Sequence, residues 1–182
     1  MNIQTNFSLK NYNTFGIDAK AKQFVSVSSI AELKEVLTKN DDIFILGGGS
    51  NMLLTEDIEK LVVHVNLKGR EIVEENDDFA IVNAQAGENW HEFVLWCIDQ
   101  NFGGIENLSL IPGNVGTTPI QNIGAYGVEI KDNMFSCDAL NLKTLEIETF
   151  TNAQCKFEYR ESVFKNELKN QREIVDTVYK ET

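Results

Sequence analysis

The stretch "IPGNVGTTPIQNIGAYG", residues 111–127, differs in composition from the rest of this 182-residue chain. No residue from Asn107 to Val128 carries a charge, although the chain has a formal net charge of -12. Both prolines of the sequence, Pro112 and Pro119, lie in this stretch. Its glycines allow positive φ angles and a close approach of the backbone to a ligand. The segment therefore predicts a long neutral loop that lines a ligand, or else a loop that only packs on the core.

A second glycine-bearing segment, "ILGGGSNMLL" at residues 45–54, follows a short apolar run. Successive N–H groups in such a loop can point at one anion. Met52 stands where a dinucleotide-binding fingerprint has its last glycine, and no Gly-Lys-Ser/Thr follows. The segment is therefore neither a Rossmann motif nor a P-loop, and a tight turn between strands remains the alternative. Two separate glycine loops favour an extended ligand that has an anionic part and a ring.

The segment "CKFEYRESVFK", residues 155–165, contains a candidate anion-binding side chain, Arg160. Arginine pairs with carboxylates through a bidentate, charge-assisted contact. The alternative is a surface ion pair between Arg160 and Glu158 or Glu161, which contributes little to stability.

Hydrophobic periodicity predicts alternating strands and helices along the chain. In the first part it predicts a strand over residues 23–29, a helix capped by Ser29, a strand that runs into Gly47, and a strand over residues 60–66. In the second part we expect strands at 70–75 and 79–86, a helix that starts at Asn89 and ends near Gly103, a hairpin over "MFSCDALNL" and "LEIETFT", a short helix near Ser162, and a strand at 172–180. The fold class is α+β, with a small βαββ unit at 1–68 and a larger, mostly antiparallel unit at 69–182.

The composition limits the partners of this chain. Hydrophobic residues make up 42% and charged residues 24%, which is ordinary for a soluble globular protein. The acidic excess argues against nucleic acid and anionic membranes as partners. Three widely spaced cysteines favour neither a disulfide framework nor a zinc site, and no metal is expected. The start of the sequence has no apolar run of a signal peptide, and no stretch resembles a membrane span. We expect a cytoplasmic monomer.

Four segments together resemble one protein family. "NYNTFGI" (11–17), "ILGGGSNMLL", "IPGNVGTTPIQNIGAYGVE" (111–129) and "CKFEYRESVFK" are similar, in order and spacing, to UDP-N-acetylenolpyruvoylglucosamine reductases. These enzymes act in the synthesis of peptidoglycan precursors, and so in cell wall biogenesis, cell shape and cell division. The resemblance covers nearly the whole chain, and "PIQNIGAYG" followed by "YRESVFK" is its most specific part.

The resemblance implies a fold like the FAD-binding domain of the vanillyl-alcohol oxidase and p-cresol methylhydroxylase superfamily. It implies FAD, with the first glycine loop at the diphosphate and the neutral loop at the flavin and adenine parts. Because the histidines and cysteines lie outside both glycine loops, we expect this FAD to be non-covalent. By the pattern of that family, the residues that would contact FAD are Asn13, Thr14, Gly47, Gly48, Gly49, Ser50, Asn51, Met52, Pro112, Gly113, Val115, Gly116, Gln121, Asn122, Ile123 and Gly124.

The reaction that the resemblance implies is a reduction of an enolpyruvyl sugar nucleotide to UDP-N-acetylmuramate, with NADPH as the source of hydride. Arg160 would be the catalytic residue that stabilises charge on the substrate carboxylate. Tyr126, Tyr159 and Gln121 would lie near the substrate.

The sequence departs from this family in one respect. Members continue into a third domain that supplies the proton donor and most of the UDP-binding surface, and we expect that substrate-binding domain to be absent here. The chain is therefore expected to be the FAD-binding half, inactive alone. Two alternatives stay open: another flavin oxidase of the same superfamily, and a non-catalytic FAD-binding or interaction module.

Overall fold

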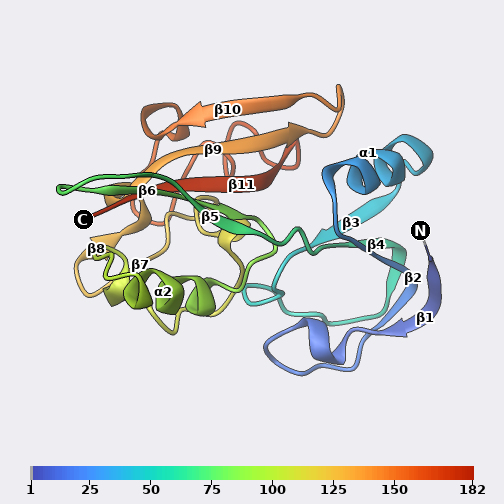
Figure 1. Cartoon of the computed structure of the whole chain (residues 1–182). Coiled ribbons are helices and arrows are strands. Elements are labelled where there is room, and N and C mark those ends of the chain that lie inside the picture. The colour runs from blue at the N-terminus through green and yellow to red at the C-terminus, as the bar shows by residue number, and fades with distance from the viewer. Residues whose placement is uncertain (1) are drawn as a thin grey trace. The chain divides into compact units, whose positions relative to one another are not determined.

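The structure, a computed structural model, describes residues 2–182. It divides into two compact units, Met1–Leu67 and Lys68–Thr182. Each unit has its own sheet and one α-helix (Figure 1).

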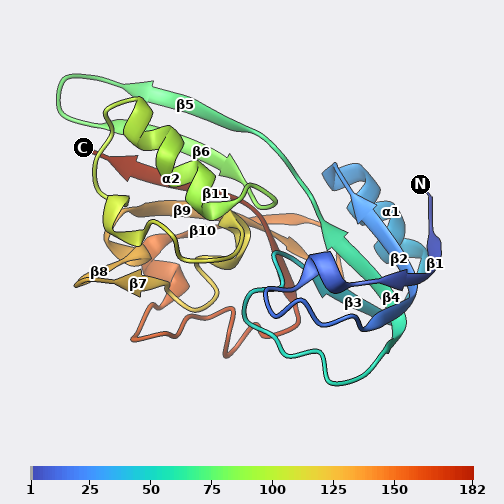
Figure 2. The ribbon, with the colours of Figure 1, turned by 90° about the horizontal axis from the view of Figure 1, so that it is seen from below.

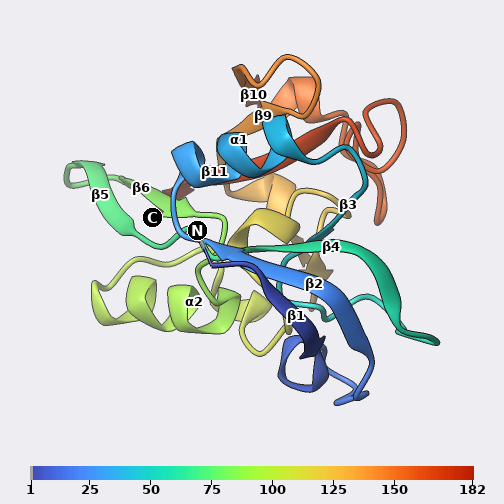
Figure 3. The ribbon, with the colours of Figure 1, turned by 90° about the vertical axis from the view of Figure 1, so that its right-hand side faces the viewer.

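The first unit is built on a four-stranded sheet in the order β1-β2-β4-β3. Strand β1 is antiparallel to β2, whereas β2 and β3 are both parallel to β4. Figure 3 shows helix α1 on one side of this sheet. The elements are β1 (Gln4–Ser8), β2 (Lys20–Val27), α1 (Ile30–Lys39), β3 (Ile43–Leu46) and β4 (Ile58–Val65).

Helix α1 begins where the sequence predicts. The side-chain oxygen of Ser29 accepts a hydrogen bond from the backbone N–H of Glu32 at 3.2 Å. The Glu32 carboxylate accepts from the backbone N–H of Ser28, not of Ser29, so the capping box is shifted by one residue. Leu33 and Val36 are the buried side chains of the helix. Their i, i+3 spacing gives the helix one apolar face.

The second unit is built on a five-stranded sheet in the order β10-β9-β11-β6-β5. Every neighbouring pair in it is antiparallel. The central strand of this order, β11, is the last strand of the sequence. The elements are β5 (Arg70–Glu75), β6 (Ala80–Gln85), α2 (Trp90–Asp99), β9 (Met134–Asn141), β10 (Ile147–Thr151) and β11 (Arg172–Glu181).

Helix α2 packs against one face of this sheet (Figure 2). Its side chains Trp90 and Phe93 are buried against Tyr179 of β11, with ring centroids 5.9 and 5.2 Å apart. The side-chain oxygen of Asn89 caps the helix by accepting from the backbone N–H of Glu92, as predicted. The three cysteines, Cys97, Cys137 and Cys155, are free, buried members of the same core.

Two sequence predictions about helices are corrected by the structure. Gly103 was expected at the end of α2, but the left-handed residue after this helix is Asn101, whose φ is 62°. Residues 163–171 form a series of turns where a short helix was expected near Ser162. The Ser162 hydroxyl donates to the carbonyl oxygen of Ile120 at 2.6 Å, so a contact distant in sequence sets this segment.

The sequence also failed to predict the edge strand β1.

The segment between α2 and β9 is irregular, as expected, and holds three short 3-10 helices and a small hairpin. They are η2 (Glu106–Leu108), η3 (Val115–Thr117), η4 (Ile130–Asp132), β7 (Gly124–Ala125) and β8 (Val128–Glu129). Within residues 2–182, no helix is long and apolar enough to cross a membrane.

Candidate functional site

In the first unit, strand β3 ends at Leu46 and leads directly into the glycine loop. Gly49 is buried at a φ of +60°. A Cβ there would overlap the carbonyl oxygen of Tyr12, so this position requires glycine for packing as well as for its φ. The backbone N–H of Thr14 donates to the Gly49 carbonyl oxygen at 3.2 Å. The two motifs of the first unit, 11–17 and 45–54, are therefore in direct contact.

Asn13 holds the 11–17 segment in shape. Its side-chain nitrogen donates to the carbonyl oxygens of Leu9 and Ile17 at 2.8 and 2.9 Å. Its side-chain oxygen accepts from the Ile17 N–H at 3.0 Å, and the residue is buried. The Asn13 side chain therefore shapes the loop by bonding within the protein, whereas the sequence predicted that it contacts the cofactor.

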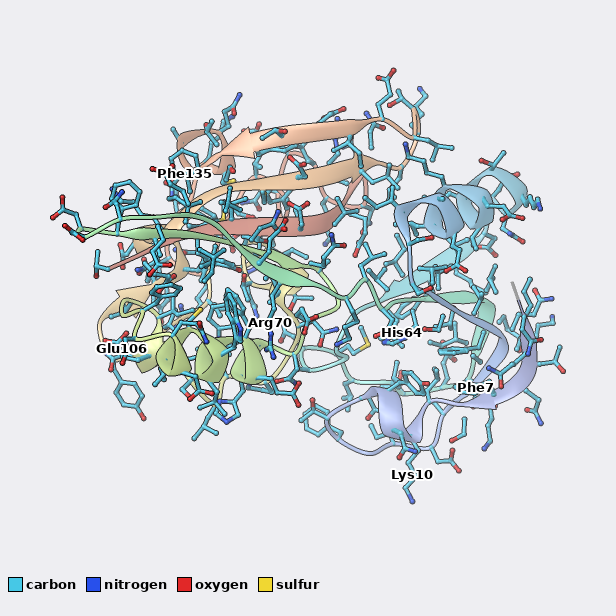
Figure 4. The ribbon with its side chains drawn as sticks, viewed as in Figure 1. Phe7, Lys10, His64, Arg70, Glu106 and Phe135 are labelled. Atoms are coloured by element: carbon cyan, nitrogen blue, oxygen red, sulfur yellow. The ribbon has the colours of Figure 1, made fainter. Side chains whose placement is uncertain are left out.

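An aromatic cluster on the same sheet anchors this segment. The Tyr12 ring lies edge-on to Phe24 and to His64, with ring centroids 5.0 Å apart in both pairs. Phe7 stacks on Phe24 at 4.0 Å, and Figure 4 labels Phe7 and His64 in this region. His64 is half-buried in strand β4.

The outward side of the two loops is neutral and accessible. Gly47, Gly48 and Ser50 are half-buried, and Asn51 is exposed. No residue of segment 45–54 carries a charge. A Gly-rich backbone of this kind can hold an anion through N–H groups without a cationic side chain. The chemistry of the loop is compatible with the diphosphate of a dinucleotide, and the contacts expected for this segment stay a prediction.

In the second unit, the first half of the neutral loop is fastened to the chain that precedes α2. The backbone N–H groups of Val115 and Gly116 donate to the carbonyl oxygens of Glu88 and Ala86 at 2.9 and 3.0 Å. A Cβ at Gly116 would lie 2.5 Å from the Ala86 Cβ. Gly116 is therefore required for packing inside the protein, whatever ligand the loop meets.

Two tight turns border the site: one is the β7–β8 hairpin at the end of the neutral loop, and the other lies at Glu158–Glu161, after β10. In the β7–β8 hairpin, Tyr126 and Gly127 have φ angles of 53° and 83°. Positive φ at both central residues is the mark of a type I′ turn. Tyr159 and Arg160 occupy the centre of the other turn, which Glu158 and Glu161 close with reciprocal backbone hydrogen bonds of 3.1 and 3.2 Å.

The two turns surround an open pocket of about 370 Å³. Tyr126 and Tyr159 at the turns are 89% and 79% exposed. The pocket brings together four of the sequence-predicted site residues, Gly124, Tyr126, Tyr159 and Arg160, and also contains charged side chains that were not predicted. Its lining residues are Gly124, Ala125, Tyr126, Gly127, Val128, Glu129, Lys131, Asp132, Tyr159 and Arg160.

Arg160 is held against the loop backbone. One guanidinium nitrogen donates to the Asn122 carbonyl oxygen at 3.1 Å, and the other donates to the Gly124 carbonyl oxygen. A Cβ at Gly124 would lie 2.7 Å from the guanidinium, so glycine makes room for it. The Arg160 side chain is still 37% exposed. Its remaining N–H donors are available for a planar anion such as a carboxylate.

The structure does not pair Arg160 with Glu158 or Glu161, the alternative considered from the sequence. Its acidic neighbour is Glu129 at 3.9 Å, while Glu161 pairs with Lys165 at 3.0 Å. Glu129 also binds Lys131 at 2.6 Å. This hydrogen bond lowers the pKa of Glu129 and raises the pKa of Lys131, so both side chains stay charged near neutral pH.

Sequence reasoning missed Glu129 and Lys131. Their position in the sequence could have indicated them, because Glu129 is the first charged residue after the neutral stretch that ends at Val128. Asn122, which was predicted to contact the cofactor, is fully buried, and its side chain bonds within the protein. Val115 and Ile123 are also buried in the core. These three residues shape the loop from its inner side.

Comparison with known proteins confirms the predicted resemblance. A UDP-N-acetylenolpyruvoylglucosamine reductase of Flavobacterium johnsoniae is 67% identical over 184 residues, which cover 100% of this chain and 55% of that protein. The corresponding reductase of Pseudomonas fluorescens is 46% identical and is covered to 50% of its length. The chain thus spans about half the length of these curated relatives.

A solved structure confirms the predicted fold class. The crystal structure of UDP-N-acetylenolpyruvylglucosamine reductase from Thermus caldophilus aligns with a TM-score of 0.79 at 21% identity, over 100% of this chain and 62% of that chain. The fold is therefore that of the vanillyl-alcohol oxidase and p-cresol methylhydroxylase type. The family described as "FAD binding domain" matches residues 21–144, more than half of the sequence. The chain belongs to this family of FAD binding domains.

Proposed function

We propose that this chain binds FAD non-covalently and forms the cofactor part of a cytoplasmic reductase of peptidoglycan precursor synthesis. The reductase would convert UDP-N-acetylglucosamine enolpyruvate to UDP-N-acetylmuramate and would use NADPH as its reductant. The similarity to full-length reductases over the whole of this chain supports this proposal. The arrangement of Arg160 in the pocket of the second unit carries it.

The two neutral loops fit the cofactor chemically. In the first unit, Gly47, Gly48 and Ser50 offer half-buried backbone next to an uncharged surface, which suits a diphosphate. In the second unit, the neutral loop offers backbone and amide groups, including Gln121, to a heteroaromatic ring edge. When bound, FAD would supply hydride to the carbon–carbon double bond of the substrate.

Arg160 would bind the substrate carboxylate. Hydride addition to a double bond conjugated to a carboxylate places negative charge on that carboxylate. A cation that is already in position stabilises this charge without reorganising during the reaction. The carbonyl oxygens of Asn122 and Gly124 hold the guanidinium in this way, and the Glu129 carboxylate forms an ion pair with the guanidinium at 3.9 Å.

The exposed tyrosines would line the substrate. The Tyr159 ring lies under the Arg160 guanidinium, 5.1 Å from its carbon to the ring centroid. This cation–π contact adds a second constraint on the guanidinium. Tyr126 stands on the facing hairpin with most of its ring exposed. The proton that completes the reduction comes, in this proposal, from outside these 182 residues, which is why we assign to them the cofactor part and not the full turnover.

Substitution of Arg160 tests this proposal. Arg160→Lys keeps the charge but loses the planar fork that spans two carbonyl oxygens. With FAD bound, the change in the flavin spectrum on adding UDP-N-acetylglucosamine enolpyruvate reports ligand affinity. We expect Arg160→Lys to weaken that affinity by about tenfold, or ~1.4 kcal/mol, while FAD affinity is unchanged.

A matched control is Arg172→Lys. Arg172 lies on β11 of the same unit, pairs with Glu148 at 2.8 Å and is not among the pocket residues. It should leave sugar-nucleotide affinity unchanged. Equal affinities of the Arg160→Lys, Arg172→Lys and unchanged chains would contradict the role given to Arg160.

A further inference from the structure

Asn122 joins the two turns that form the pocket. Its side-chain nitrogen donates to the carbonyl oxygen of Glu158 at 3.0 Å, at the base of the turn that carries Tyr159 and Arg160. Its side-chain oxygen accepts from the backbone N–H of Lys131 at 3.2 Å, just after the β7–β8 hairpin that carries Tyr126. One amide group thus holds the bases of both turns.

The backbone of Asn122 makes a third contact with the site. Its carbonyl oxygen accepts from the Arg160 guanidinium at 3.1 Å. The residue has a φ of 45°, in the left-handed region that asparagine tolerates better than most residues. Because Asn122 is 0% exposed, water does not compete for the hydrogen bonds that its polar atoms make.

We infer that Asn122 is a positioning residue that sets the distance between Arg160 and the Tyr126 hairpin, and so the affinity of the pocket for a carboxylate-bearing ligand. It acts through Arg160 and not by touching the cofactor, in contrast to the role expected from the sequence motif. Its consequence for the reaction rests on the proposed function. The positioning itself does not, since it concerns contacts within the second unit.

Two substitutions separate the parts of this bridge. Asn122→Gly accepts the left-handed backbone without strain and removes the amide, so both turns lose their link. Asn122→Asp keeps an oxygen that accepts from Lys131 N–H, but an ionised carboxylate faces the Glu158 carbonyl oxygen without a donor. When protonated, the same carboxyl regains a donor. The second variant therefore has a pH signature of its own.

A control of the same type lies in the β9–β10 hairpin. Asn141 is also a buried asparagine whose side chain makes two kinds of contact, to the Glu148 carboxylate at 2.7 Å and from the backbone N–H groups of Lys143 and Thr144. It does not line the pocket. Asn141→Gly reports the effect of losing a buried amide elsewhere in the same unit.

The first readout needs no ligand: the side-chain N–H signals of Arg160 in NMR spectra, assigned by their loss in Arg160→Lys. In the unchanged chain and in Asn141→Gly we expect these signals to be protected from solvent exchange. In Asn122→Gly we expect them to broaden and to exchange at least about tenfold faster, because the side-chain hydrogen bonds to Glu158 and Lys131 that hold the two turns are lost.

The second readout is affinity. With FAD bound, Asn122→Gly should weaken binding of UDP-N-acetylglucosamine enolpyruvate by about tenfold or more, while FAD affinity changes by less than about twofold. The affinity of Asn122→Asp for the sugar nucleotide should rise as pH falls from about 8 to 5, because burial raises the pKa of the introduced carboxyl. The unchanged chain should not show this rise.

Unaltered Arg160 signals in both Asn122 variants would overturn the inference. An equal loss of affinity in Asn122→Gly and Asn141→Gly, or a loss of FAD affinity as large as that of sugar-nucleotide affinity, would overturn it as well. If Asn122→Gly does not fold, the pH dependence of Asn122→Asp decides. A complete absence of sugar-nucleotide binding in the unchanged chain would contradict only the role proposed for Arg160 at the substrate carboxylate, because the Arg160 signals would still test the positioning.

Discussion

Left-handed residues gather around the pocket of the second unit. Asn122, Tyr126 and Arg160 have φ angles of 45°, 53° and 57°. Such a conformation costs a side chain other than glycine roughly 1 kcal/mol or more. Tyrosine and arginine gain nothing from it locally, so the surrounding hydrogen bonds maintain it. The result is that both side chains stand at the tips of tight turns, where they border the same pocket.

Gly49 gives a stability prediction for the first unit. Gly49→Ala places a Cβ onto the Tyr12 carbonyl oxygen at a φ of +60°. Gly16 has a φ of +65° with no atom within 4 Å of such a Cβ, so Gly16→Ala is the matched control. In urea unfolding we expect Gly16→Ala to cost about 1 kcal/mol and Gly49→Ala clearly more, about 3 kcal/mol. Equal costs would contradict a tight contact between Gly49 and the Tyr12 carbonyl oxygen.

Glu181 gives a pH prediction. This residue of β11 is buried, and burial, together with the nearby charge of Glu106, raises its pKa to about 8 from an ordinary 4.5. Because the pKa is higher in the folded state, the unfolded state releases the proton first as pH rises. The folded protein is therefore penalised progressively between about pH 4.5 and 8, and the penalty is absent below this range.

The variant Glu181→Gln isolates this effect. Its free energy of unfolding, compared with that of the unchanged chain, should show a gain of a few kcal/mol at most at pH 8, at about 1.4 kcal/mol per pH unit, and a smaller gain at pH 5. Glu75→Gln, on the exposed strand β5, should show no such trend. A gain from Glu181→Gln that does not grow with pH would contradict the raised pKa.

At the level of elements, caps and side-chain anchors decide where helices and loops begin. Asn89 caps α2, and its neighbour Trp90 donates its backbone N–H to the Gly113 carbonyl oxygen at 3.0 Å. The cap thus lies where the neutral loop is fastened. Arg70 of β5, which Figure 4 labels, contacts the same helix: it donates to the Glu92 carbonyl oxygen and lies over the Trp96 ring.

The cap of α2 is testable by substitution. Asn89→Ala removes the acceptor of the Glu92 N–H and should lower the free energy of unfolding by about 1 kcal/mol, whereas Asn89→Asp should be nearly neutral because aspartate also caps. Chemical denaturation of the three proteins measures this difference. Equal stability of the alanine and aspartate variants would mean that the cap contributes nothing.

Most elements could be predicted from sequence because their apolar residues follow the helix or strand period. Strand β1 could not, since all but its last two residues are exposed and its pattern lacks an apolar face. The expected helix near Ser162 is absent because its hydroxyl binds Ile120, 42 residues earlier, and no local pattern reports that contact. Asn122 shows the same limit at the site: the motif marked it as important, but only the structure shows that it is buried and bonds to Glu158, Lys131 and Arg160.

At the scale of the whole molecule, the chain has two units that each carry one neutral glycine loop. Family resemblance, not composition, identified these loops with a dinucleotide. We predict that the chain does not complete turnover alone, since it spans about half the length of the reductases it resembles. With FAD, NADPH and UDP-N-acetylglucosamine enolpyruvate, we expect no product above background. Sustained NADPH oxidation coupled to product formation by the purified 182 residues would contradict this prediction.

The binding of FAD by the chain itself tests the central claim most directly. Titration of the purified protein with FAD, followed by calorimetry and by the visible spectrum, gives the affinity. We predict saturable binding, a rise in stability of about 2.7 kcal/mol at a hundredfold excess over Kd, and release of all yellow colour on acid precipitation. A colourless protein with no heat of binding and no thermal shift at saturating FAD would contradict the account.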